Sequence, residues 1–359
     1  MNVTASPIAS AFSATYREAR AKFLATASAA GLQATSILHP LQGPEGEELA
    51  LDLVRDGPPE AERVLILSSA CHGVEGFCGS GVQVTLLQDA AWRAECARTG
   101  TAVVYAHGLN PWGFAWLRRM TNENVDLNRN FHDFGGPLPE NAGYAQLAEH
   151  IVPAQWPQAE SDREMLEAYA RANGPMALQQ AITGGQHSHP QGLFFGGNAP
   201  TWSQGAMRRM LREQAGRCKT LGWIDFHTGL GPRGHGERIL AGPPETGPRA
   251  RHIWGHMTSP DDGTSTSAPL TGNLWVMVAQ EVPQAEYTGM ALEYGVVPLQ
   301  QTLDALRGDQ WLHNHPEASQ EQRARIKREL LDAFYGDDDA WKTAIVEQGR
   351  EAAMAYLRA

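Results

Sequence analysis

The sequence predicts an α/β fold. Three apolar runs, at residues 48–54, 63–69 and 101–107, have the length and composition of strands. The middle run, VLILSS, is almost continuously apolar, as expected for a central strand covered on both faces. A helical pattern at 79–96 separates the second run from the third. A strand–helix–strand unit of this length is typical of a crossover connection.

Helices and strands keep alternating along the rest of the chain, without an internal repeat or an obvious linker. Two further apolar runs, 221–226 and 291–294, are interpreted as strand residues. We therefore expect one domain over residues 1–359, with an N-terminal helix within 1–34 and C-terminal helices in 318–359. The helical patterns lie at 8–31, 159–182, 202–219, 299–308 and 318–358.

Composition excludes some classes of partner. The chain of 359 residues has 40 acidic and 29 basic side chains, for a net charge of −11. Nucleic acids and anionic membranes both favour a basic surface, so neither is an expected partner. No stretch approaches the ~18 apolar residues of a membrane helix, and residues 1–13 do not resemble a secretory signal. The four cysteines show no paired spacing, which favours free thiols and a cytoplasmic location.

Metal-ligating side chains follow two of the predicted strands. His72 and Glu75 come after the strand at 63–69, and His227 comes directly after the strand at 221–226. Ligands collect outside the carboxyl ends of strands in open α/β sheets. Two histidines and a glutamate, with one position left open, are a recurrent catalytic zinc set. The alternative is a capped loop with a solvated glutamate and a hydrogen-bonded loop histidine.

Two acidic residues lie close to these candidate ligands in the predicted fold. Glu293 lies at a third strand end, between apolar neighbours, where a carboxylate can act as a general base on a zinc-bound water. Asp225 is close enough to His227 in sequence to serve as the hydrogen-bonding partner of that ligand. The alternative for Glu293 is an ordinary surface carboxylate.

Arginine and asparagine side chains are concentrated in the long loop after residue 107. Arg118 and Arg119 precede the segment VDLNRNF, which contains Asn128 and Arg129. Guanidinium groups bind carboxylates through two parallel hydrogen bonds and can stabilise an oxyanion. The alternative is that these arginines form surface salt bridges.

The order of these motifs resembles a known group of enzymes. HxxE, NPxGF, an arginine pair, VDLNRNF, DFHTG and LEYG follow one another over residues 63–295, as in the M14 zinc carboxypeptidases. The sequence is most similar to the bacterial DUF2817 branch, and more distantly to aspartoacylases and succinylglutamate desuccinylases. This resemblance implies an α/β/α sandwich around a mixed, mostly parallel sheet, and a zinc-peptidase-like single domain.

The resemblance also implies roles for the metal site. His72, Glu75 and His227 match the ligands of one zinc ion per chain. Glu293 matches the catalytic base that activates a zinc-bound water.

For the substrate, the resemblance implies a small peptide or an acylated amino acid with a free carboxylate. Arg119 matches the arginine that polarises the scissile carbonyl, and Arg118 is an alternative because the register of that loop is open. Asn128 and Arg129 match the pair that binds the terminal carboxylate.

Several functions remain open at this point. The stretch 270–275 carries no tyrosine where pancreatic-type carboxypeptidases have a mobile one. An N-acyl amino-acid deacylase of the aspartoacylase type would use the same residues, and a non-catalytic zinc-binding protein is a further alternative. A serine hydrolase is disfavoured because no serine has glycines two residues before and after it. A cysteine hydrolase using Cys71 or Cys78 would leave the HxxE motif unexplained.

Overall fold

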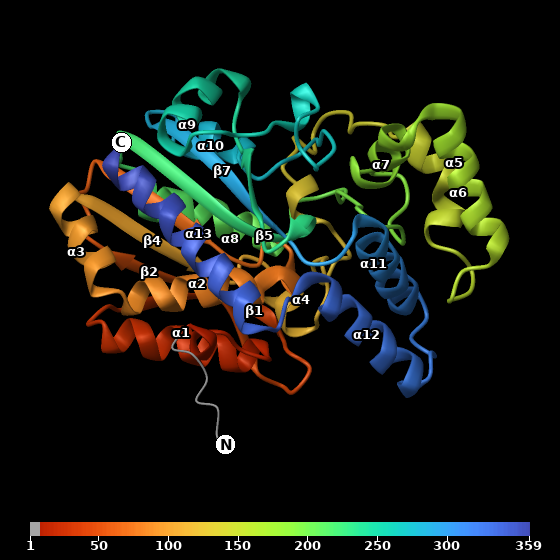
Figure 1. Ribbon diagram of the computed structural model, residues 1–359, viewed down its shortest axis with the longest axis horizontal. Coiled ribbons are helices and arrows are strands. Elements are labelled where there is room, and N and C mark those ends of the chain that lie inside the picture. Colours follow the sequence, from red (N-terminus) through yellow and green to blue (C-terminus); the bar gives the residue numbers. More distant parts are fainter. Residues whose placement is uncertain (1–7) are drawn as a thin grey trace.

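A seven-stranded sheet forms the centre of the computed structural model, which describes residues 8–359 (Figure 1). Residues 1–7, the start of the predicted N-terminal segment, lie outside the described part. Across the sheet the strands follow the order β1-β2-β4-β3-β5-β7-β6. Their bounds are β1 Ala34–Gln42, β2 Glu48–Asp56, β3 Arg63–Ser68, β4 Thr101–His107, β5 Thr220–Arg233, β6 Gly236–Leu240 and β7 Glu286–Gly295.

The four central strands are parallel and the flanking pairs are antiparallel. β4, β3, β5 and β7 pair in parallel, whereas β1, β2 and β6 add antiparallel pairs at the two sides. The mixed, mostly parallel sheet predicted from the motifs is therefore confirmed. His72 follows β3, whereas His227 and Glu293 lie within β5 and β7 and are paired in the register of these two strands.

Helices cover both faces of the sheet, which confirms the predicted sandwich. Alternate residues of β3 point to opposite faces: Leu65 and Leu67 pack into one apolar cluster, and Val64 and Ile66 into another. The first cluster includes the helices on one face of the sheet, and the second includes α8 and α10 on the other. The helices of these two layers are α1 Tyr16–Ala29, α2 Gly76–Gln88, α3 Ala90–Thr99, α8 Trp202–Ala215, α9 Gly247–Trp254, α10 Val276–Glu281 and α13 Asp339–Arg358.

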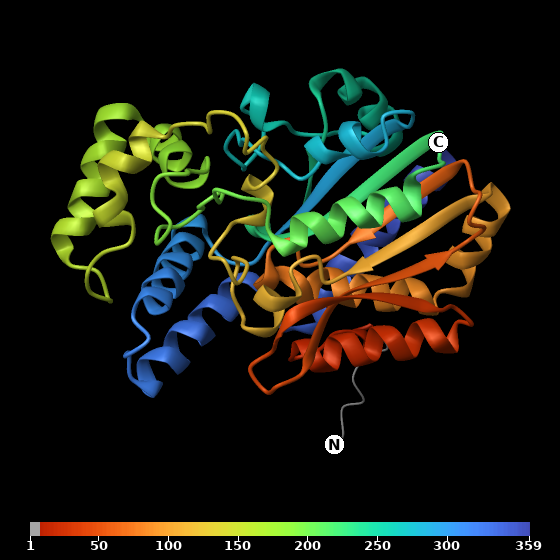
Figure 2. The same ribbon diagram turned by 180° about the vertical axis from the view of Figure 1, so that it is seen from behind.

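Five further helices gather beside one end of the sheet, as the two opposite views show (Figures 1 and 2). They share a third apolar cluster built around Tyr144, Ile182, Leu306 and Phe334. Their bounds are α5 Ala142–Ile151, α6 Glu160–Asn173, α7 Pro175–Thr183, α11 Leu299–Asn314 and α12 Gln320–Phe334. Residues of α7, α11 and α12 line the cleft described below, so this group of helices forms one of its walls.

Local boundaries differ from the predictions where turn chemistry outweighs periodicity. The predicted helix 79–96 is two helices, because Asp89 accepts hydrogen bonds from the amides of Ala91 and Trp92 and starts a new helix there. The predicted helix 159–182 is likewise divided, at Gly174 before a proline. The edge strands β1 and β6 were not predicted.

Within residues 8–359, no helix combines the length and the apolar character needed to span a bilayer. All four cysteines are buried free thiols.

Candidate metal centre and substrate cleft

His72 and Glu75 are held by a tight crossing of two backbone segments. After β3 the chain passes into a 3₁₀ turn, Gly73–Glu75, which packs on α4 (Pro111–Ala115). A Cβ atom on Gly73 would lie 2.0 Å from the carbonyl carbon of Gly113, so only glycine allows this approach. The amide of Gly73 donates to the carbonyl oxygen of Arg119 at 3.2 Å. The HxxE motif is therefore fixed against the arginine loop.

The three predicted ligands converge. His227 lies on β5, and its Nδ1 atom is 3.2 Å from Nδ1 of His72 and 3.1 Å from Oε2 of Glu75. Nδ1 of His72 is 2.9 Å from Oε1 of Glu75. One donor atom from each residue lies within 4.8 Å of the others, and all three side chains are buried. Two imidazole nitrogens and a carboxylate in this arrangement suit Zn²⁺.

Each histidine is also oriented by an aspartate on the far side of its ring. Nε2 of His72 lies 3.2 Å from Oδ1 of Asp126, and Nε2 of His227 lies 2.6 Å from Oδ2 of Asp225. Ser68 in turn donates to Asp225 Oδ1 at 2.5 Å. Carboxylate partners of this kind orient the ring so that Nδ1 faces a metal. Nε2 of His72 also lies 2.8 Å from Nη2 of Arg119. The sequence analysis considered Asp225 for this role but missed Asp126, two residues before Asn128 in VDLNRNF.

The buried carboxylates keep their charge through their neighbours. Burial alone would raise the pKa of Glu75, but His72 and His227 outweigh it and hold that pKa below its usual range. Burial would likewise raise the pKa of Asp126, and the guanidinium groups of Arg119 and Arg129 bring it well below normal. Both carboxylates are therefore ionised at neutral pH.

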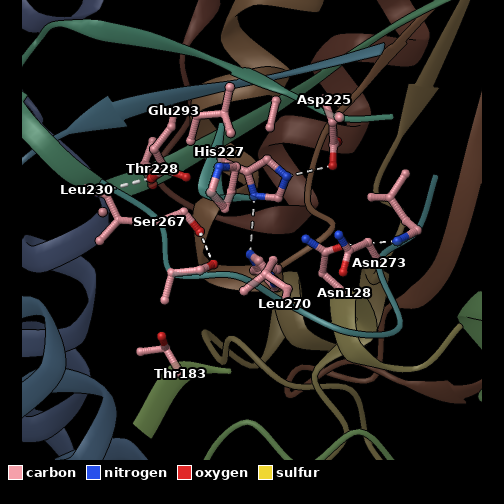
Figure 3. Close-up of a pocket in the computed structure, with 18 of the residues that line it drawn as sticks. Asn128, Thr183, Asp225, His227, Thr228, Leu230, Ser267, Leu270, Asn273 and Glu293 are labelled. Carbon is pink, nitrogen blue, oxygen red and sulfur yellow. Dashed lines mark hydrogen bonds and ion pairs between the residues drawn. The ribbon is translucent and has the colours of Figure 1, made fainter. Parts of the chain in front are cut away.

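Glu293 has the opposite electrostatic setting. It pairs with His227 in the register of β5 and β7, and its side chain is buried. Its Oε1 atom accepts a hydrogen bond from the amide of Leu230 at 3.1 Å (Figure 3). Burial, reinforced by the nearby charge of Glu75, raises the pKa of Glu293 to about 8. A carboxyl group that titrates near neutrality suits both accepting and returning a proton.

The two adjacent arginines point to different surroundings. Arg119 lines the cleft, with Nη1 2.9 Å from Glu75 Oε1 and Nε 3.0 Å from Asp126 Oδ2. Arg118 is 4% exposed and donates to Asp309, at 2.9 Å, on α11. Its Nη2 atom also lies within hydrogen-bonding distance of Asn124 and Gln310, so successive side chains of this loop face opposite ways. A role of Arg118 in substrate binding stays a prediction.

Arg129, with the carboxamide of Asn128 beside it, forms the cationic side of the cleft. They lie in a 3₁₀ turn, Leu127–Arg129, and the side chain of Asp126 accepts a hydrogen bond from the amide of Asn128. Arg129 donates through Nε and Nη2 to the carbonyl oxygen of Thr183, at 3.1 and 2.6 Å. Burial lowers the pKa of Arg129 to about 10, with Asp126 opposing that shift, so the group remains a cation at neutral pH. Its remaining N–H groups are available to an anion.

The cleft joins these groups in one space, with Asn128 and Asn273 on one side of His227 and Glu293 on the other in the view of Figure 3. It encloses about 1070 Å³, its open mouth included. The cleft also has an apolar lining that was not predicted from the sequence. That lining is formed by Trp223, Ile239, Leu240, Leu270, Leu274, Trp275, Tyr287 and Met290. The catalytic and binding roles assigned to the polar side chains stay predictions.

Comparison with known proteins identifies a family. The model of the family described as "Protein of unknown function (DUF2817)" matches residues 12–348. This match confirms the DUF2817 resemblance predicted from the motifs. No curated protein matches the chain.

Several solved structures are similar at low identity. Bovine thrombin-activatable fibrinolysis inhibitor, solved with tick carboxypeptidase inhibitor, is 12% identical over 96% of this chain and 98% of that one, with a TM-score of 0.47. A metallo-carboxypeptidase from Pseudomonas aeruginosa is 14% identical over 93% and 69%, with a TM-score of 0.40. A Shewanella frigidimarina protein, provisionally a succinylglutamate desuccinylase or aspartoacylase, is 18% identical over 77% and 68%, with a TM-score of 0.35. We assign no activity to this chain from these similarities.

The donor set predicts a metal-dependent gain in stability. Zinc should raise the melting temperature of the metal-free protein. The free energy of unfolding should rise by about 2.7 kcal/mol when free zinc is about 100 times Kd. His227→Ala should abolish that rise, because it removes one of three ligands. His252→Ala, at an exposed histidine, is the matched control and should keep it. An equal zinc response in all three proteins would refute the site.

The raised pKa of Glu293 predicts that it lowers the stability of the metal-free protein in a pH-dependent way. Between pH 4.5, the ordinary pKa of a glutamate, and about pH 8, the folded state keeps a proton that the unfolded chain has released, so the free energy of unfolding falls as pH rises. Glu293→Gln removes this cost. The variant should gain on the order of 1–3 kcal/mol over wild type between pH 5 and pH 8.5 in denaturant unfolding. Glu286→Gln, at an exposed position of the same strand, should show no such gain in stability. If Glu293→Gln gained the same stability at every pH, this explanation would be contradicted.

Proposed function

The chain belongs to the DUF2817 family, and from that premise we propose that it is a zinc-dependent hydrolase that cleaves an amide bond next to a free carboxylate. One observation carries the proposal. His72 and His227, which converge with Glu75, line one cleft together with Glu293, the neutral Asn128 and the cation of Arg129. A hydrolase of this kind needs each of these groups within reach of one substrate.

Substrate binding begins at the cationic side. Arg129 offers the guanidinium N–H groups that Thr183 and Asn128 leave unused, and Asn128 offers its carboxamide N–H₂. Together they hold a carboxylate and place the neighbouring amide against His72, Glu75 and His227. Holding the reacting groups in place in this way supplies part of the rate acceleration.

Zinc fits the donor set, since two imidazole nitrogens and one carboxylate leave a fourth position open. When bound there, it would lower the pKa of water and polarise the substrate carbonyl. The aspartates behind both histidines support this fit, because they hold Nδ1 of each ring toward the common centre.

Proton transfer falls to Glu293 and charge stabilisation to Arg119. Glu293 takes a proton from the attacking water as the water oxygen bonds to the carbonyl carbon. The carbonyl oxygen becomes an oxyanion, which the guanidinium of Arg119 stabilises. Glu293 then gives its proton to the amide nitrogen, the carbon–nitrogen bond breaks, and an amine and a carboxylic acid leave. A pKa raised by burial suits this acceptance and return.

A second candidate uses the same site on a different substrate. An N-acyl amino-acid deacylase needs the same carboxylate contacts and the same proton transfer, and the Asn128–Arg129 pair supports it equally well. Peptides and acylated amino acids differ on the acyl side of the bond, away from this pair.

The four buried thiols are consistent with a cytoplasmic location, which is part of the proposal.

Replacing the base separates chemistry from metal binding. Zinc-loaded protein should hydrolyse members of a mixed pool of short peptides and N-acyl amino acids, followed by mass spectrometry. Glu293→Gln should lower the rate by roughly 10²-fold or more, because the proton acceptor is lost, while it still binds one equivalent of zinc. Glu286→Gln is the matched control and should remain active.

The pattern of products decides between the two candidates. Loss of single C-terminal residues from peptides identifies a carboxypeptidase, and release of amino acids from acylated compounds alone identifies a deacylase. Undiminished turnover by Glu293→Gln would show that the base is assigned wrongly.

A further inference from the structure

Asn273 lines the cleft and has an unpaired, buried carboxamide oxygen. Its Oδ1 atom is buried, yet no group in residues 8–359 donates a hydrogen bond to it. The residue lines the same cleft as Asn128, Arg129 and Glu293. Burying an acceptor without a donor costs free energy, so such an atom in a native protein requires an explanation. The location of Asn273 in the cleft favours one explanation: a bound substrate donates the missing hydrogen bond.

The backbone around Asn273 is fixed on both sides. The amide of Phe131 donates to the carbonyl oxygen of Gly272 at 3.0 Å, and the amide of Leu274 donates to Oδ1 of Asn128 at 2.9 Å. Gly272 has φ +72°, and a Cβ there would lie 2.5 Å from the carbonyl oxygen of Arg129. Only glycine permits this contact. These contacts hold the backbone of Asn273 against the turn that contains Asn128 and Arg129.

The substrate of the proposed function offers a suitable donor. Its amide N–H sits on the carbon that bears the free carboxylate, one bond from the scissile carbonyl. With the carboxylate at Asn128 and Arg129 and the carbonyl near His72 and His227, the N–H falls between these two anchors. A carboxamide oxygen accepts one hydrogen bond from such a group without adding charge beside the carboxylate.

We propose that Oδ1 of Asn273 accepts a hydrogen bond from the N–H of the amide that is cut. This inference rests on the proposed function and adds a substrate-binding residue to it. The contact fixes rotation about the nitrogen. When the carbonyl carbon becomes tetrahedral, the nitrogen lone pair points away from Asn273 and is free to receive the proton that Glu293 returns.

A matched pair of substrates tests this contact. One member is an N-acyl amino acid or peptide, and the other is its ester analogue, in which oxygen replaces the scissile N–H and the carboxylate is unchanged. Asn273→Ala should lower kcat/KM on the amide about tenfold, the effect of one lost hydrogen bond, and change kcat/KM on the ester less than about twofold. Thr271→Ala, at an exposed residue of the same loop, should leave both values unchanged.

Other outcomes overturn the inference. Equal losses on amide and ester would mean that Asn273 supports the cleft without contacting the N–H, and no loss on either would mean that it does not contact substrate. Melting temperatures of the variants check folding. Asn273→Ser, which keeps a polar side chain but shortens its reach, serves in place of the alanine variant if that one unfolds. Hydrolysis of neither substrate by wild type refutes the proposed function and the inference with it.

Discussion

The site depends on two hydrogen bonds between an aspartate and a histidine ring. Asp126 holds Nε2 of His72, and Asp225 holds Nε2 of His227. Each bond turns the opposite nitrogen, Nδ1, toward Glu75, so one donor atom of each residue lies within 4.8 Å of the others. The strands position the histidines, but the aspartates determine which ring atom faces the centre.

A buried aspartate carries a negative charge that has to be balanced, and side chains of the neighbouring loop balance the charge of Asp126. Asp126 is fully buried, and it is stabilised by Arg119 at 3.0 Å and by the cation of Arg129 at 3.9 Å. The same two guanidinium groups face the cleft. In the proposed function, the same buried charges that orient His72 would also present cations to a substrate carboxylate and to a developing oxyanion. Removing one partner from such a network leaves a buried charge unpaired, which is costly.

Much of this arrangement could be predicted from the sequence, because strand ends in a parallel sheet converge. The apolar runs containing Ile66 and Ile224 identified two central strands, and His72 and His227 directly follow them. Side-chain direction in irregular loops could not be predicted. Whether Arg118 or Arg119 faces the cleft depends on the turn at Leu117, where φ is 49°.

The apolar wall and Asn273 were also beyond sequence reasoning. Their positions depend on long-range contacts, such as that of Leu274 with Asn128 at 2.9 Å. The periodicity of apolar residues in the sequence does not reveal such long-range contacts. The short edge strand β6, which supplies Ile239 and Leu240 to the cleft, shows no alternating pattern long enough to be distinguished from a loop.

In the proposed function, the protein cleaves an amide bond because a free carboxylate lies next to that bond. The most direct measurement compares kcat/KM of zinc-loaded protein on a cleaved substrate and on the same compound with its carboxylate converted to a carboxamide. Losing the charged contacts with Arg129 should reduce kcat/KM on the order of a hundredfold. Equal values for the two compounds would contradict the account, because the cationic side of the cleft would then play no part in choosing the substrate.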